Sequence, residues 1–206
     1  MNSRMIIATA LALLTTCSLS CVAIPTGAVF RATGGGYTDA GLKGDYFPNA
    51  TFSGAPSFTR QDVRIDFDWG TVLPVGGSLT APYASFPREQ FSVRWTGRVI
   101  ARFSETYTFV VTADDTVTIE IKPTNSAVWT ELINCGAPTD GATGAYAFSA
   151  GIPYDLRIAY VQHTGAARVS LAWRSPSTPL EIIGPVTLQG VNANQIGRAS
   201  CRERVF

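Results

Sequence analysis

Few side chains in this sequence of 206 residues could carry out chemistry or bind a metal ion. Two adjacent carboxylates stand at Asp114 and Asp115. Such a pair can supply negative charge to Ca²⁺, which takes about six to eight oxygen ligands. It can equally cap a turn between two strands by accepting backbone N–H groups. The residue types alone leave both interpretations open.

A second pair of carboxylates, Asp66 and Asp68, has the spacing of neighbours on one strand face, about 7 Å apart. The acid and base of a glycosidase could have such a separation. Because Arg64 falls on the same face, we favour structural salt links. The sequence has one histidine, His163, so it offers little basis for a Ser-His-Asp or Cys-His arrangement. We therefore predict a noncatalytic protein.

The elements that must position these side chains follow a period of two. Apolar and polar residues alternate in six segments, which predicts strands with one buried and one exposed face. The first segment begins with Val63 and Ile65 on its buried face. The six segments are 63–69, 91–96, 107–112, 117–122, 154–160 and 169–173.

Clusters of Gly, Pro, Asn and Ser separate these segments, and no stretch of ten residues has the 3.6 period of a helix. Hydrophobic residues make up 46% of the chain, enough for a packed core, and charged residues only 15%. Many short strands without crossover helices predict an all-β fold, an antiparallel two-sheet β-sandwich. Trp69, Trp95 and Trp173 are in phase with the buried faces and are expected in the core.

The formal net charge of +1 provides no basic field for nucleic acid or an anionic membrane. Residues 1–23 have the pattern of a secretory signal peptide, with an apolar run too short to span a membrane. Residues 195–206 look like the translation of a sequencing adapter, so we expect them to take no part in the fold. Without both ends, Cys135 is the one remaining cysteine, which argues against an internal disulfide framework.

An ordered set of motifs runs through the chain between these ends. The motifs are Gly41-Leu-Lys-Gly-Asp-Tyr-Phe47, Phe52-Ser-Gly54, Ile65-Asp-Phe-Asp-Trp69, Phe91-Ser-Val-Arg-Trp-Thr-Gly97, Thr106-Tyr-Thr-Phe109, Asp114-Asp115, Leu156-Arg-Ile-Ala-Tyr160 and Val169-Ser-Leu-Ala-Trp173. The set resembles the anthrax protective-antigen module, the PA-fourteen domain, over residues 37–177. Residues 24–36 are then a predicted linker, and residues 178–194 a linker or the start of a further region.

The resemblance implies a β-sandwich that occurs in secreted glycosidases, adhesins and toxins and that binds carbohydrate in several members, often through calcium. In the lectin members two adjacent aspartates, joined by a cis peptide bond, hold the ion, and Asp114 and Asp115 match them. Gln162 is the nearest match to an asparagine that supplies another oxygen. Thr116 stands where most members have glycine. The neutral Gln162 implies a modest calcium affinity.

The expected ligand contacts are His163, Thr164 and Trp129. His163 could hydrogen-bond a ligand or remain a solvated side chain, and Trp129 could stack on a sugar ring or plug the edge of the sandwich. We thus predict a secreted, calcium-assisted carbohydrate-binding module, with a glycan as its partner and no membrane span. The alternatives are a structural or adhesion spacer without a functional ligand site, and an accessory domain of a glycoside hydrolase. The sugar and the oligomeric state do not follow from the sequence.

Overall fold

The computed structural model describes residues 29–31, 41–74 and 85–184. These residues form strands, turns and loops and contain no helix, which confirms the predicted all-β class. The twelve strands are β1 (Val29–Arg31), β2 (Leu42–Phe47), β3 (Phe58–Asp62), β4 (Asp66–Gly70), β5 (Phe91–Ile100), β6 (Thr106–Asp114), β7 (Thr116–Pro123), β8 (Thr130–Cys135), β9 (Thr139–Ala147), β10 (Pro153–Gln162), β11 (Ala167–Ser175) and β12 (Thr178–Ile182).

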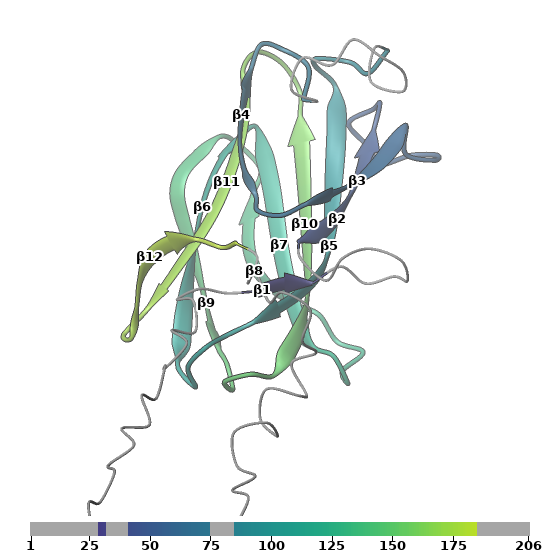
Figure 1. The fold of residues 1–206 in the computed structure, drawn as a ribbon. Helices are drawn as coiled ribbons and strands as arrows, with labels where there is room; N and C mark the ends of the chain where they lie inside the picture. Colours follow the sequence, from purple (N-terminus) through teal and green to yellow (C-terminus); the bar gives the residue numbers. More distant parts are fainter. Residues whose placement is uncertain (1–28, 32–40, 75–84, 185–206) are drawn as a thin grey trace, which may run out of the picture.

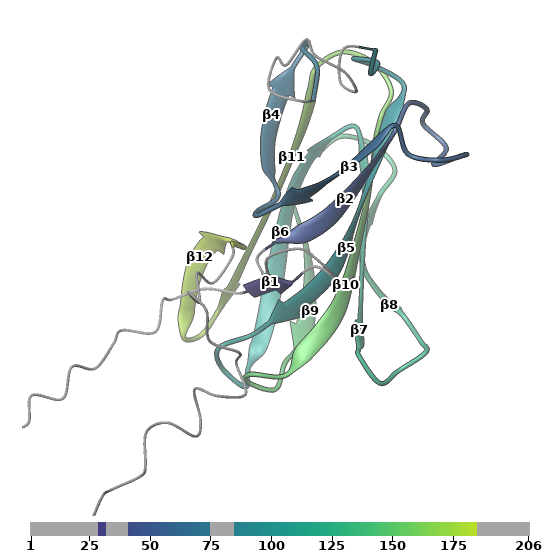
Figure 2. The same ribbon diagram turned by 45° about the vertical axis from the view of Figure 1, so that its right-hand side comes forward.

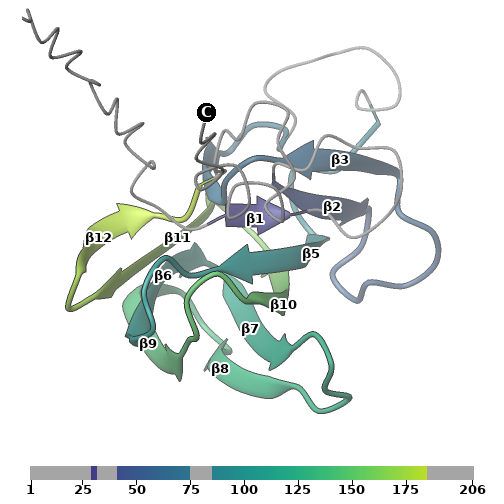
Figure 3. The same ribbon diagram turned by 60° about the horizontal axis from the view of Figure 1, so that its bottom comes forward.

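The strands form two sheets that pack as the layers of a sandwich (Figure 1 and Figure 3). One sheet has the order β3-β2-β5-β10-β7-β8, and β1 also pairs with β5. The other has the order β12-β11-β6-β9, and β4 also pairs with β11. All of these pairings are antiparallel. The predicted antiparallel two-sheet β-sandwich is therefore confirmed.

The chain changes sheets between β3 and β4, and this explains a departure from the predicted alternation. The sequence pattern places Val63 on a buried face, but its side chain is 50% exposed. Val63 lies in the bend after β3, and β4 begins only at Asp66. Side chains alternate between the two faces only within a continuous strand, so the bend places Val63 outside the alternation. Ile65, also predicted on the buried face, is buried. The other five predicted segments lie within β5, β6, β7, β10 and β11.

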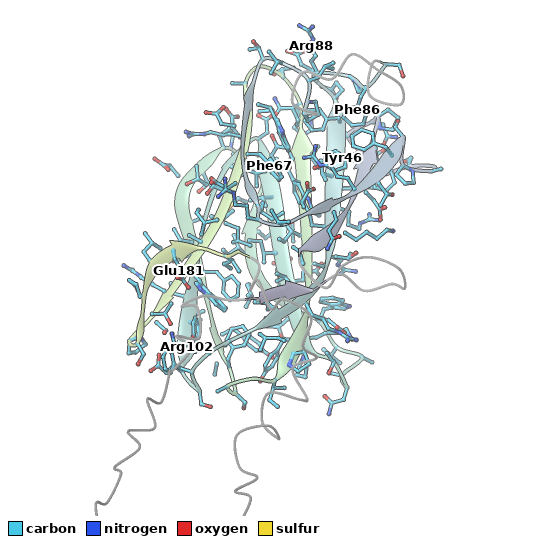
Figure 4. The ribbon with its side chains drawn as sticks, viewed as in Figure 1. Tyr46, Phe67, Phe86, Arg88, Arg102 and Glu181 are labelled. Atoms are coloured by element: carbon cyan, nitrogen blue, oxygen red, sulfur yellow. The ribbon has the colours of Figure 1, made fainter. Side chains whose placement is uncertain are left out.

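Aromatic side chains fill much of the space between the two sheets. The three tryptophans predicted in the core are buried: Trp69, Trp95 and Trp173. Figure 4 shows Tyr46, Phe67 and Phe86 within the upper half of the molecule, and the rings of Tyr46 and Phe86 are 6.2 Å apart. Burial of such large rings stabilises the described part of the chain, where Cys135 forms no disulfide.

A buried carboxylate ties the strands β2, β3 and β5 together. Asp62 is only 5% exposed, and it accepts hydrogen bonds from the Tyr46 hydroxyl, the Trp95 indole N–H and the Arg60 Nε, each at 2.7 Å. Gly44 makes room for it, because a Cβ there would lie 2.7 Å from the Asp62 Oδ2. Several residues of the family-like motifs therefore meet at one structural hydrogen-bonded cluster.

The strands extend beyond the predicted domain of residues 37–177 at both ends. β1 lies in the predicted linker 24–36 and pairs with β5, and β12 lies in the predicted segment 178–194 and pairs with β11. The predicted signal peptide and the segment 195–206 lie outside the described residues. None of the described segments forms a helix that is long and apolar enough to cross a membrane.

Candidate functional site

Two connections between the sheets meet at one end of the sandwich. The turn from β6 to β7 contains Asp114 and Asp115, and the connection from β10 to β11 consists of residues 163–166, called the 163–166 loop below. Because β10 pairs with β7 and β11 pairs with β6, the two connections lie side by side. They lie at the upper end in Figure 1, the end at which Figure 4 shows Arg88.

Asp115 connects the β6–β7 turn to the 163–166 loop. Its Oδ2 accepts the backbone N–H of His163 at 2.6 Å and that of Thr164 at 3.3 Å. The peptide bond between Asp114 and Asp115 is cis, as the family resemblance implies. The His163 and Thr164 side chains are exposed beside this contact. The structure therefore brings together four of the residues predicted for the site.

The carboxyl group of Asp114 lies in an environment that disfavours its negative charge. Partial burial and the neighbouring Asp115 carboxylate both raise the pKa of Asp114, while the guanidinium of Arg168 lowers it. Arg168 is the β11 residue directly opposite Asp114 in the sheet register. A cation placed at the two carboxylates would relieve their mutual repulsion.

Gln162 belongs to the interior of this end of the molecule. Its side chain is fully buried, and its Oε1 lies 2.7 Å from the Tyr160 hydroxyl, which donates to it. The same hydroxyl contacts the backbone carbonyl oxygen of Asp114. Burial and the carboxylates of the Asp pair raise the pKa of Tyr160, which keeps the hydroxyl protonated as a donor. The Gln162 Nε2 lies 3.1, 3.4 and 3.3 Å from the carbonyl oxygens of Thr164, Gly165 and Ala166, respectively.

The segment before β5 holds the other side of the 163–166 loop. The Gly165 N–H donates to the Glu89 Oε1 at 3.0 Å, and both the backbone N–H and the Nε2 of Gln90 donate to the His163 carbonyl at 3.0 Å. Gly165 has a φ of +85°, a conformation that favours glycine. Sequence reasoning missed Glu89, Gln90 and Arg168, because only the strand pairing brings them here.

Trp129 does not lie at this site. It directly precedes β8, so the full length of β7, about 25 Å, separates its end of the sandwich from the Asp pair. Figure 2 shows the turn between β7 and β8 at the lower end, away from β4. The guanidinium of Arg157 and the ammonium of Lys122 lie 4.6 and 5.3 Å from the centre of the Trp129 ring. This placement favours the structural interpretation of Trp129 over contact with a ligand at the Asp pair.

Asp66 and Asp68 lie in β4, on the edge of the same sheet as Asp114. Both are exposed, and the Asp68 Oδ1 accepts the N–H of Gly70 at 3.1 Å. In the sheet register, Arg168 of β11 stands between Asp68 on one side and Asp114 on the other. The second carboxylate pair is thus two strands away from the Asp114–Asp115 turn.

The residues at the turn provide only part of what Ca²⁺ requires. Asp114 and Asp115 fit as the charged ligands, although one oxygen of Asp115 already accepts two N–H groups. Gln162 does not fit as a ligand in this arrangement, because its amide oxygen faces the Tyr160 hydroxyl. Its side chain is one methylene longer than that of asparagine and extends beneath the loop. Among the described residues, no group of three or more His, Cys, Asp or Glu could hold a metal ion.

Comparison with known families and structures defines the class of this fold. The PA14 domain family model matches residues 39–186, so the chain belongs to the PA14 domain family. The family resemblance of the sequence motifs is thereby confirmed. Anti-sigma-I factor RsgI3 of Acetivibrio thermocellus is 34% identical over an alignment of 181 residues, and the match covers 82% of this chain and 26% of that protein. The chain therefore spans about a quarter of this curated relative.

Solved structures show the same fold in different proteins. An anti-sigma factor domain-containing protein from Clostridium clariflavum is 33% identical with a TM-score of 0.59, and the match covers 70% of this chain and 45% of that chain. The Epithelial Adhesin 9 A domain from Candida glabrata, in complex with Galb1-4GlcNAc, is 12% identical with a TM-score of 0.53. That match covers 81% of this chain and 99% of the adhesin domain, and it shows likeness of fold alone.

Proposed function

We propose that this chain is a noncatalytic carbohydrate-binding module of a secreted or cell-surface protein. The observation that carries the proposal is the pair of adjacent, half-buried carboxylates beside the exposed 163–166 loop. Membership of the PA14 domain family supports it, and so does the sugar complex of an adhesin domain with the same fold.

We further propose that the module is calcium-assisted, with Asp114 and Asp115 as the charged ligands. A calcium ion with few protein ligands supplies open coordination positions, which sugar hydroxyls can occupy. The protein residues orient the sugar: the exposed side chains of His163 and Thr164 lie beside the carboxylates and can exchange hydrogen bonds with its hydroxyls. Burial and the neighbouring Asp115 carboxylate raise the pKa of Asp114, although Arg168 lowers it, and a bound cation would offset the repulsion between the two carboxylates.

A glycan array with and without chelator tests both parts of the proposal. We expect binding to a defined set of glycans in Ca²⁺ and its loss in EDTA. Glycan binding that persists in EDTA would contradict the role of calcium but would still support carbohydrate binding by the module. Binding that persists in EDTA and disappears in the double variant Asp66→Asn/Asp68→Asn would instead place the site on β4. The absence of binding to any glycan would favour a spacer or adhesion module without a functional ligand site.

A second candidate places the module in a regulatory protein of the anti-sigma factor type. The observation that favours it is the 34% identity to an anti-sigma-I factor, together with a solved anti-sigma factor structure at 33% identity. In that case binding at the Asp pair would be the input to a signal rather than a means of adhesion. The full-length transcript tests this candidate, because it would encode a sigma-factor-binding region; a glycoside hydrolase domain there would support the accessory-domain alternative.

A further inference from the structure

We propose that Gln162 is a positioning residue: it holds the 163–166 loop in place beside the Asp pair without the help of a metal ion. The proposal rests on the proposed function, since it concerns the loop that frames the same site. It assigns Gln162 a role different from that of an ion ligand. The ion then contributes charge and ligand contact, while the protein itself supplies the shape of the loop.

The first observation is the buried position of the Gln162 amide. The side chain is fully buried, and its nitrogen lies within 3.1–3.4 Å of three successive carbonyl oxygens of the loop. Three carbonyl oxygens that converge on one point need a donor or a cation, because they repel one another and are costly to leave unpartnered. The Gln162 amide places its two N–H donors among these three oxygens, nearest to the Thr164 carbonyl at 3.1 Å.

The second observation is that residues outside the loop partner most of its other backbone groups. Gln90 donates twice to the His163 carbonyl. Asp115 accepts the N–H groups of residues 163 and 164, and Glu89 accepts that of Gly165. The His163 carbonyl oxygen and three N–H groups of the loop therefore have partners outside it, and the two N–H donors of Gln162 face the other three carbonyl oxygens. A loop bonded in this way has its conformation before any ion or sugar arrives.

The third observation is the connection between the loop and the Asp pair. The Tyr160 hydroxyl contacts both the Gln162 Oε1 and the Asp114 carbonyl oxygen, so one buried hydroxyl joins the two connections between the sheets. Gln162 thereby fixes the loop relative to Asp114 on one side, while Asp115 fixes it on the other. Movement of the Gln162 amide would displace the loop relative to the carboxylates.

Hydrogen exchange of the full chain, in EDTA and in Ca²⁺ alone, tests the proposal at named amides. In the wild type we expect the amides of His163, Thr164 and Gly165 to be equally protected under both conditions. In Gln162→Glu and in Gln162→Met, which keeps the length but lacks the amide, they should exchange about tenfold faster or more. Core amides of β5 and β10 should keep their protection, whereas a purely structural residue would change the two groups together.

Two further variants make the test specific. Gln90→Ala is the matched control. It removes the exposed side-chain hydrogen bond to the His163 carbonyl, but that carbonyl keeps the bond from the backbone N–H of residue 90. The increase in loop exchange should therefore be smaller than in the Gln162 variants. Gln162→Glu also separates the two roles by calorimetry with Ca²⁺. A ligand role predicts tighter Ca²⁺ binding from the added charge, whereas the positioning role predicts no gain, because a carboxylate cannot donate to the loop carbonyls.

The proposal is overturned if the loop amides of the wild type become protected only when Ca²⁺ is added. It is also overturned if Gln162→Glu binds Ca²⁺ more tightly while loop exchange stays unchanged. Both outcomes require that Ca²⁺ binds, whereas the exchange rates of the wild type and of the Gln162 variants in EDTA do not depend on the proposed function. A wild type that binds neither Ca²⁺ nor any glycan would contradict the proposed function, while the exchange rates in EDTA would still decide the role of Gln162.

Discussion

Asp62 and the Asp114–Asp115 pair show how the same side chain serves two purposes in one sandwich. Asp62 is buried and accepts hydrogen bonds from three side chains, one on its own strand β3 and two on the other strands β2 and β5 of its sheet. Asp115 is half-buried and accepts N–H groups from a surface loop, and Asp114 lies against it with a raised pKa. Complete partnering of a buried carboxylate indicates a structural role, whereas a carboxylate near solvent keeps oxygens that a ligand could contact.

The largest expected effect is the loss of the buried carboxylate. Asp62→Ala should lower the free energy of unfolding by about 2–4 kcal/mol, because it leaves the buried Tyr46 hydroxyl and Trp95 indole N–H without an acceptor. Chemical denaturation checks this. The exposed Asp66→Asn is the matched control and should change stability by less than about 0.5 kcal/mol. Equal losses in both variants would break the comparison.

Loss of either carboxylate of the Asp114–Asp115 pair should weaken Ca²⁺ binding rather than lower stability. Asp114→Asn and Asp115→Asn should each lower Ca²⁺ affinity by about tenfold or more, because each removes a formal charge from a lightly charged site. Ca²⁺ should raise the melting temperature of the wild type by mass action, and much less so in either variant. In EDTA, Asp114→Asn should be no less stable than the wild type, because its raised pKa means that folding disfavours the charged form.

Removal of the Arg168 charge should change Ca²⁺ affinity in the opposite direction from removal of an Asp114 or Asp115 charge. Its guanidinium lowers the pKa of Asp114 and so competes with a bound cation for the same negative charge. Arg168→Gln should therefore tighten Ca²⁺ binding, by about two- to fivefold for an exposed charge at moderate salt. Calorimetry at two salt concentrations checks the electrostatic origin, since the gain should shrink as salt rises. If the Ca²⁺ affinity of the variant is equal at both salt concentrations, the charge of Arg168 does not control calcium binding.

The sandwich was predictable because alternation is a local property that each strand shows on its own. The core positions of Trp69, Trp95 and Trp173 follow directly from it. Asp62 was not predictable in the same way, since its partners come from strands that become neighbours only in the folded sheet. The Asp pair was singled out by its residue type and by the family resemblance. The bonds of Gln162 could not be anticipated, because they depend on how a longer side chain packs beneath a loop.

His163 and Trp129, both predicted as ligand contacts, lie at opposite ends of the sandwich, so their variants test which end binds the glycan. His163→Ala should weaken glycan binding by about fivefold, the factor for one net hydrogen bond, without loss of stability. Trp129→Ala should leave glycan affinity unchanged and lower stability by about 1 kcal/mol, because the ring contacts Arg157 and Lys122. Titration with an array-positive glycan checks both. A loss of binding in Trp129→Ala alone would move the site to the lower end.

The smallest expected effect concerns Glu105, a surface carboxylate that extends the series from the buried and half-buried cases. It accepts the backbone N–H of Ser177 at 3.1 Å and the hydroxyl of the same residue. The Ser177 hydroxyl is the main cause of a pKa of Glu105 below its ordinary value of 4.5, followed by the Ser175 hydroxyl and, more weakly, the Ser177 N–H. A lowered pKa means that the contribution to stability is present above about pH 4.5 and is lost as the pH falls through the folded-state value.

Glu105→Gln should therefore lower the melting temperature slightly at pH 6, and the difference from the wild type should shrink at pH 3. Ser177→Ala should show the same convergence, because it removes the hydroxyl that stabilises the charged form. Thermal unfolding at the two pH values checks both variants. A difference that stays constant with pH would show that the contact acts through packing rather than charge. In that case the Glu105 contact would not depend on the carboxylate charge, unlike the Asp114–Asp115 pair. If the melting temperatures instead converge at pH 3, Glu105 is a carboxylate whose charge is stabilised by a loop, as in the Asp pair, but more weakly because solvent screens it.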